Sequence, residues 1–214
     1  VYKRQPYCEP DKCQLCGMGL NFPNSTCPDS TWVDCSEEHV VVPSSATRID
    51  RDAFRQCTNL KSINMSGSQV SYIGSSAFRD LPNLHTVHLP ETMDEIKSYA
   101  FYGCTSLQTV VMPTHMNILG AQAFRNCISV TSVTIPEGIT TLNVATFRDC
   151  TQLSHVVLPS TLEQIFASVF RDTNLPWMLL SPTVTTVKDH AFPNGYGYVH
   201  PPPLPPPSPL PAPP

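Results

Sequence analysis

The sequence predicts a β-rich repeat solenoid of about seven 23-residue coils, preceded by a cysteine-rich cap and followed by a proline-rich tail. Phenylalanine recurs about every 23 residues through the middle of the chain. Five of the nine cysteines lie between positions 8 and 35, and ten of the 23 prolines lie in the last fourteen residues. These changes divide the 214 residues into a cap (1–37), a solenoid (38–198) and a tail (199–214).

The cap places its cysteines among Gly, Pro, Asn and Asp, which is typical of a small disulfide-linked module. Its candidates for two disulfides, whose three possible connectivities stay open, are Cys8, Cys13, Cys16 and Cys27. A zinc site at Cys13-x2-Cys16 is the alternative, although no second pair of matching spacing accompanies it. Trp32 and Cys35 each lie 22 residues before a repeat residue, so we expect the cap to end in a degenerate coil.

Seven of the nine phenylalanines form one series with intervals of 22 to 24 residues. The series consists of Phe54, Phe78, Phe101, Phe124, Phe147, Phe170 and Phe192. Alanine precedes five of them, and apolar residues recur five positions before and six, nine and eleven positions after them. A unit of this size can bury its apolar side only against its neighbours, so the period predicts stacked coils.

Each coil is expected to combine a short strand with a tight turn. Leu107, Val110 and Met112 follow the spacing of a strand, and Pro113 ends it because proline cannot donate to a continuing ladder. The alanine and phenylalanine together predict a helical or 3₁₀ turn that drives the ring into the coil centre, where burial is worth about 2 to 3 kcal/mol.

Segments such as AFYGCTSLQTVVMP and IPEGITTLNVATFRDCTQLSHVVLP resemble the BspA-like leucine-rich repeats of bacterial and unicellular eukaryotic surface and secreted proteins. This resemblance implies a right-handed solenoid used for adhesion, binding or surface architecture, without catalysis. The sequence departs from the pattern at Thr146 and Val169 in the alanine column, and at Pro176, which replaces the strand leucine of the last coil.

Cysteine forms a column of its own, three residues after the phenylalanine. Its predicted members, with Cys35 at the foot, are Cys35, Cys57, Cys104, Cys127 and Cys150. Leu81 occupies the same position in one coil, which favours buried thiols acting as small apolar side chains. Disulfides between adjacent coils, Cys104 to Cys127 or Cys127 to Cys150, remain the alternative because coils are spaced by about 4.8 Å.

Charge and composition exclude several classes of function. The formal charge of −4 with 13 scattered basic residues argues against a nucleic-acid partner, and no apolar run is long enough for a membrane span. A surface rich in neutral polar groups predicts a secreted or cell-surface protein, which begins at Val1 as a mature or truncated product. His85, His88 and His155 are interpreted as surface residues, and no motif predicts a cofactor or catalysis.

Arginine follows five of the phenylalanines, at positions 55, 79, 125, 148 and 171. One interpretation is a stripe that binds anions or acidic glycans. The favoured one is that Asp80, Asp149 and Asp172, each one residue later, form a neighbouring column that balances the charge through weak surface pairs.

The outward strand positions become more apolar toward the C-terminus. Candidates for partner contact are Val111, Val157, Trp177, Met178 and Leu180. The proline tail is a possible occupant, and a covered end coil that completes its own core is the alternative.

Two kinds of glycan attachment are predicted. Asn24 and Asn64 begin sequons for N-glycans. The tail is expected to form polyproline II, and its Pro-Ser-Pro segment resembles hydroxyproline-rich cell-wall proteins of plants and green algae. That resemblance implies hydroxylation and O-linked sugars on Pro201, Pro202, Pro203, Pro205, Pro206, Pro207, Ser208 and Pro209.

Together these features predict a non-catalytic extracellular glycoprotein with a structural or adhesive role. We expect self-association, in which copies assemble head to tail into a surface fibre through unpaired strand edges at the solenoid ends. The alternative is a monomeric recognition domain that binds a protein or glycan on its strand face.

Overall fold

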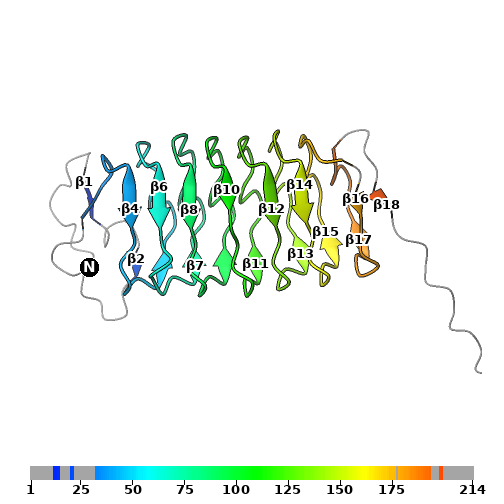
Figure 1. Cartoon of the computed structure of the whole chain (residues 1–214), viewed down its shortest axis with the longest axis horizontal. Helices are drawn as coiled ribbons and strands as arrows, with labels where there is room; N and C mark the ends of the chain where they lie inside the picture. Colours follow the sequence, from blue (N-terminus) through cyan, green and yellow to red (C-terminus); the bar gives the residue numbers. More distant parts are fainter. Residues whose placement is uncertain (1–11, 15–19, 22–31, 177, 194–197, 200–214) are drawn as a thin grey trace, which may run out of the picture.

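The chain forms an elongated β-solenoid in which each coil contributes one strand to each of two rows (Figure 1). The computed structural model describes residues 12–14, 20–21, 32–176, 178–193 and 198–199, with side chains from 35 to 193 except 177. Within those residues there is no helix of the length and hydropathy that a membrane crossing requires. The predicted solenoid is therefore confirmed.

The strands are short, as the proline spacing predicts. The first row consists of β4 (His39–Val41), β6 (Ser62–Asn64), β8 (Thr86–His88), β10 (Thr109–Val110), β12 (Ser132–Thr134), β14 (His155–Val157) and β16 (Met178–Leu179). The second row consists of β5 (Arg48–Ile49), β7 (Tyr72–Ile73), β9 (Glu95–Ile96), β11 (Ile118–Leu119), β13 (Thr141–Leu142), β15 (Gln164–Ile165) and β17 (Thr186–Val187). The turn after five of the seven row-one strands begins at a proline, whose carbonyl accepts a bond from the amide three residues on, as in Pro113 to Met116 at 3.2 Å; Met65 and Ser181 accept the equivalent bond after β6 and β16.

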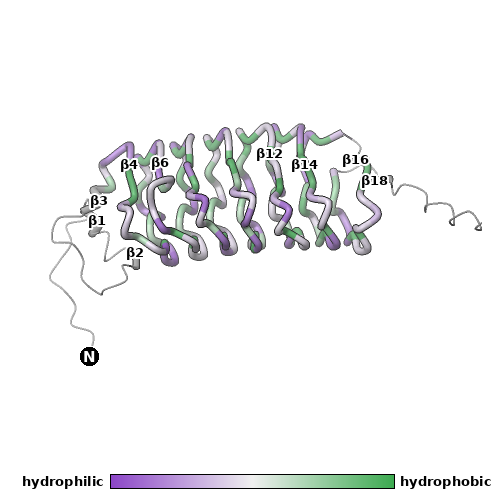
Figure 2. Tube along the Cα trace, turned by 60° about the horizontal axis from the view of Figure 1, so that its bottom comes forward, coloured by the Kyte–Doolittle hydropathy of each residue, from purple (hydrophilic) through white to green (hydrophobic). Residues whose placement is uncertain are grey.

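Parallel pairing runs along both rows and keeps equivalent residues side by side. In the first row the ladder joins β4, β6, β8 and β10, and separately β12 and β14. In the second row it joins β5, β7, β9 and β11, and separately β13, β15 and β17. Figure 2 shows apolar segments recurring in step from coil to coil, as expected for residues that face the common core.

The seven repeat phenylalanines form a continuous stack through the core. Neighbouring ring centroids lie 5.0 to 5.8 Å apart, and six of the seven rings are fully buried. The backbone follows the rings: the amide of each phenylalanine from 54 to 170 donates to a carbonyl one coil further on, at 2.7 to 3.0 Å. The column therefore combines aromatic packing with a third ladder of hydrogen bonds.

Two left-handed residues in each coil shape the turn that holds the ring. The residue two before the phenylalanine has φ of 54 to 63° in every coil from Asp52 to His190. The residue two after it has φ of 57 to 72° in five coils, and there the sequence supplies Asp, Asn or Gly, which tolerate this conformation best. At Gly103, φ is +72° and an added Cβ would lie 2.5 Å from Asp80 Oδ1, so a larger residue there would have to displace the Asp80 side chain.

The N-terminal end is built differently from the coils. β1 (Lys12–Gln14) and β3 (Trp32–Asp34) pair antiparallel, and β2 (Leu20–Asn21) adds antiparallel to β5. A disulfide joins Cys35 to Cys57 with a Cα separation of 4.4 Å, linking the end of the cap to the first coil. The side chains of Cys8, Cys13, Cys16 and Cys27 lie outside the described residues.

The last coil departs from the predicted register. Leu175 is buried and fills the strand-leucine position that was assigned to Pro176, which is exposed. One residue is missing from this coil, since the last phenylalanine interval is 22, and the strand therefore shifts by one position. Leu179 consequently faces solvent at 62% exposure and Leu180 is 1% exposed, so the expected outward side chain at Leu180 is wrong.

The continuous stack predicts that replacing a phenylalanine costs more stability in the middle of the rod than at its end. Phe124→Ala removes a ring that contacts two others and should lower the free energy of unfolding by about 3 to 5 kcal/mol. Phe192→Ala removes an end ring with one stacked neighbour in the described coils, so its cost should be clearly smaller. Urea denaturation followed by circular dichroism measures both, and equal costs would contradict a continuous stack.

Candidate functional site

The outward face of the first row is a regular surface that follows the strands along the rod. Each strand presents two outward positions, and the first of them carries a hydroxyl or an imidazole in six coils: His39, Ser62, Thr86, Thr109, Ser132 and His155. The second position forms a mixed column of Val41, Asn64, His88, Val111, Thr134, Val157 and Leu179. The surface therefore offers hydrogen-bonding groups beside apolar contacts along its whole length.

Large apolar side chains are exposed mainly in the second of these columns. Six of them are exposed in the described part of the chain, and four belong to this column. Val41 is 74% exposed, Val111 73% and Val157 45%. Leu179 completes the set, whereas Ile118 and Val144 lie on the second row and the turn that follows it.

A hollow of about 300 Å³ lies at the carboxyl ends of β8 and β10. His88, Thr86 and Thr109 line it with polar groups, while Val111 supplies an apolar wall and Glu91 a charged rim. This combination suits a ligand with both hydroxyl and apolar surfaces.

The histidines do not converge on a common site. His39 Nδ1 lies 2.7 Å from Ser62 Oγ, and His85 Nδ1 contacts the carbonyl oxygen of Asn83. Among the residues with described side chains, no group of three His, Cys, Asp or Glu could hold a metal ion. Each imidazole thus serves as a separate polar contact on the face.

Asn64, the second sequon asparagine, lies at the outward end of β6 and is partly exposed. Its Oδ1 accepts hydrogen bonds from the backbone N of Ser66 at 3.0 Å and from Ser66 Oγ at 2.7 Å. Met65 between them is fully buried, which fixes the tripeptide against the core.

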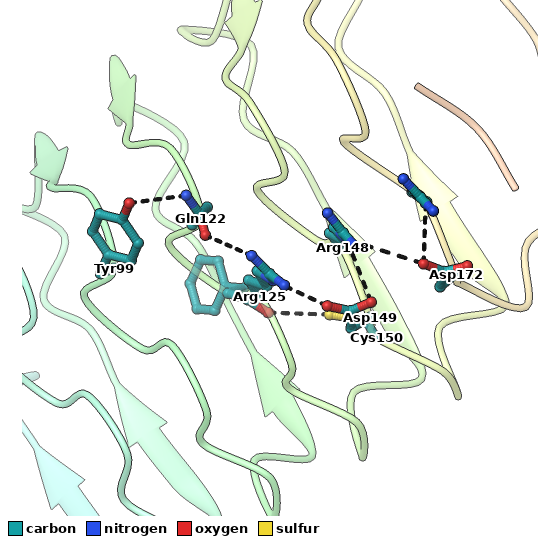
Figure 3. Close-up of polar contacts among 9 residues, drawn as sticks. Tyr99, Gln122, Arg125, Arg148, Asp149, Cys150 and Asp172 are labelled. Carbon is teal, nitrogen blue, oxygen red and sulfur yellow. Dashed lines mark hydrogen bonds and ion pairs between the residues drawn. The ribbon is translucent and has the colours of Figure 1, made fainter. Parts of the chain in front are cut away.

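The arginine column is neutralised by the neighbouring aspartates. Arg125 Nε lies 3.0 Å from Oδ2 of Asp149, and Arg148 Nε lies 3.5 Å from Oδ1 of the same carboxylate. Asp172 in turn pairs with Arg148 at 4.0 Å and Arg171 at 3.3 Å (Figure 3). This staggered chain supports the favoured interpretation of balanced surface pairs, which contribute little individual stability.

Aromatic rings also contact the guanidinium groups in the middle of this edge. Tyr102 occupies the arginine position of its coil and lies between Arg79, 4.8 Å from its ring centroid, and Arg125, 5.7 Å away. Gln122 connects the same edge by donating to Tyr99 Oη at 2.9 Å and accepting from Arg125 at 3.0 Å (Figure 3). The guanidinium groups are therefore engaged within the edge.

The cysteine column contains three free thiols and one disulfide among the described residues. Cys104, Cys127 and Cys150 donate to a phenylalanine carbonyl of the preceding coil at 3.0 to 3.1 Å. Burial raises the pKa of Cys104 and of Cys150 to about 12 and that of Cys127 well above its ordinary value. These groups act as packing and hydrogen-bonding residues in this structure, and the alternative pairings between them are not formed.

The structure brings some of the predicted contact residues together and separates others. Val111 and Val157 point outward in one column, and Met178 is partly buried beside them. Leu180 belongs to the core, while Trp177, Asn24 and the proline tail lie outside the described residues. Leu179 was missed, although the short final phenylalanine interval was a signal that the register shifts.

The two rows of short strands and the repeated core columns define a leucine-rich repeat protein. A family model for the BspA type leucine rich repeat region matches six copies over residues 25–150 and 71–197. The chain belongs to this family, as the segments quoted from the sequence predicted.

Solved structures share this architecture. A leucine-rich repeat protein from Bacteroides ovatus superposes with a TM-score of 0.69 at 24% identity, over 82% of this chain and 49% of its own. One from Eubacterium ventriosum gives 0.69 at 26% identity over 76% and 45%. A leucine rich cell surface protein from Faecalibacterium prausnitzii gives 0.63 at 25% identity, over 73% and 45%.

The chain spans about half the length of the Bacteroides ovatus protein. No curated protein matches the sequence. These comparisons show the family and the fold.

The buried thiols predict selective resistance to alkylation. At pH 8 the folded chain should leave Cys104, Cys127 and Cys150 unmodified by iodoacetamide, because they are buried and their raised pKa values keep them protonated. After unfolding in urea all three should react. Peptide mass spectrometry assigns each site separately, and rapid labelling of the folded chain at these peptides would contradict the burial.

Proposed function

We propose that this chain is a non-catalytic extracellular binding protein that adheres to a protein or glycan through the outward face of its first strand row. The observation that carries the proposal is that four of the six exposed large apolar side chains lie in one column of that face. Exposed apolar positions that recur in one line along a rigid surface are typical of a contact surface.

The polar groups of the face support recognition of an extended ligand. Hydroxyl and imidazole groups repeat beside the apolar column, at the strand spacing of about 4.8 Å. A ligand lying along the rod would meet a hydroxyl or imidazole in each coil from β4 to β14 and an exposed apolar side chain in four of the seven coils. The membership of the family and the likeness to a cell surface protein of Faecalibacterium prausnitzii support a surface or extracellular location.

N-glycans at Asn24 and Asn64 and modified prolines in the tail form part of the same proposal. Asn64 would carry its glycan on the recognition face, near the hollow beside His88, because the two residues are register partners. A glycan there would leave the coils from β12 onward as the accessible part of the face.

Head-to-tail assembly into a fibre is the second candidate. Within the described residues, β4 and β17 are the outer strands of their sheets, so each offers backbone groups for pairing. Burial of the core at both ends weighs against end-to-end stacking, because little apolar surface is left to cover. Val42 in the first coil is 3% exposed and Phe192 in the last coil is 8% exposed. Electron microscopy of concentrated native protein distinguishes filaments from single rods, and rods alone at every concentration would exclude this candidate.

Binding on the strand face can be tested with a printed glycan array and a random-peptide display library as probes. Val157→Asp should weaken a selected ligand at least about tenfold, because it places a charge in the contact. Val144→Asp is the matched control, since Val144 is 44% exposed on a different side of the coil. The proposal fails if neither probe yields a ligand or if both variants bind with unchanged affinity.

A further inference from the structure

The first-row ladder is interrupted between β10 and β12 and again between β14 and β16, near the C-terminal end of the row. β14 pairs with β12, and β16 pairs with β18 (Tyr198–Val199), so among the described residues no ladder joins β14 to β16. In the second row the equivalent strands β15 and β17 remain paired. The two coils are therefore joined along the second row and by the bond from Asn174 N to Leu153 O at 3.0 Å, and we call the region between the described parts of β14 and β16 the slot.

The sequence explains why the slot lies here. In preceding coils the residue immediately after the strand leucine donates its amide to the coil before, as Ser154 N does to Thr131 O at 3.0 Å, whereas this coil places Pro176 immediately after Leu175. Proline lacks the donor that the ladder needs, and the coil is one residue shorter than those before it. Ladder pairing of β16 with β14 is lost while Leu175 and Leu180 stay anchored in the core.

Two hollows flank the slot, with volumes of about 240 and 350 Å³. Val156, Met178 and Leu179 line both of them. Leu179 is 62% exposed and thus forms an apolar ridge between two depressions. Hydrogen-bonding groups border this apolar floor, with His155 and Ser154 at one hollow and Ser160 and Ser181 at the other.

A polyproline II segment fits this surface by its chemistry. Such a segment has apolar ring faces, uses no internal hydrogen bonds and presents its carbonyl oxygens to its surroundings. The slot supplies apolar depressions for rings, and the His155 imidazole and Ser181 hydroxyl can donate to carbonyls, whereas Ser154 and Ser160 already donate to Thr131 and Glu137. Residues 200–214 of this chain contain ten prolines, two leucines and no acidic residue, so they have the required composition.

We propose that the slot between β14 and β16 binds residues 200–214 of a second copy of this chain. The chain's own tail is poorly placed, because β18 lies on the far side of β16 from the slot. A tail leaving β18 would have to reverse within about two strand spacings, roughly 10 Å. Pro201, Pro202 and Pro203 oppose such a reversal, since consecutive prolines favour an extended course.

The length of the tail suits a partner in trans. At about 3.1 Å per residue, residues 200–214 would extend roughly 45 Å, beyond the end of their own rod. One molecule can therefore reach the slot of another, and the contact differs from end-to-end stacking because it uses the side of the rod. This contact between two copies does not depend on ligand binding by the other coils.

Self-association of the full chain is the direct test, measured by sedimentation velocity over a concentration series. We expect concentration-dependent association that Leu179→Asn weakens by at least about tenfold. Leu204→Asp combined with Leu210→Asp in the tail should weaken it similarly. Val41→Asn is the matched control, because Val41 is as exposed in the same column but lies at the opposite end of the rod, and it should associate normally.

A fluorescent synthetic peptide of residues 200–214 identifies the occupant. It should bind the doubly substituted full chain, whose own tail no longer competes, and lose that affinity when Leu179→Asn is added. Circular dichroism confirms that each variant is folded. A monomer at all concentrations, unchanged association of folded Leu179→Asn, or a peptide that binds regardless of Leu179 would each overturn the proposal, the first in favour of docking within one chain or of a different occupant.

Discussion

Stacking of one phenylalanine ring from each coil on the ring of the next is the constraint on which the remaining structure depends. The rings lie 5.0 to 5.8 Å apart, close to the strand spacing of about 4.8 Å, so the same rise satisfies aromatic packing and backbone pairing. Because the rise is shared, every other position of the repeat falls into a column as well. Thiols, left-handed turn residues and Arg–Asp pairs are consequences of this single repeat.

In a structure built from repeated columns, the loss of one residue can change one strand and leave the core columns unchanged. The loss of one residue before Leu175 leaves the core columns intact but moves the strand beside it, which opens the first row and exposes Leu179. The second row, which retains its register, holds the coils together. The rod can therefore vary its surface coil by coil, as recognition of an extended ligand requires, without losing the stacking that stabilises it.

The period predicted the fold, the core columns and the family, because burial against neighbours forces the same residue type at the same position in each coil. The period did not predict that Leu179 is exposed. Counting positions from the preceding phenylalanine does not reveal the residue that is missing between Phe170 and Leu175. The aspartates after the arginines were predicted as charge partners, but their second role is conformational: Asp80, Asp149 and Asp172 have φ near +60°. The alternation of arginine and aspartate predicts ion pairs, but it does not indicate that these aspartates adopt a left-handed backbone conformation.

The central claim is that one 23-residue coil is the physical unit of this protein. Deleting residues 109–131 removes one complete unit and joins Gln108 to Ser132 in register, whereas deleting residues 109–120 removes about half a unit. Circular dichroism during thermal unfolding should show a cooperative transition for the first deletion and none for the second, which breaks the ring stack. Equal behaviour of the two deletions would contradict the account.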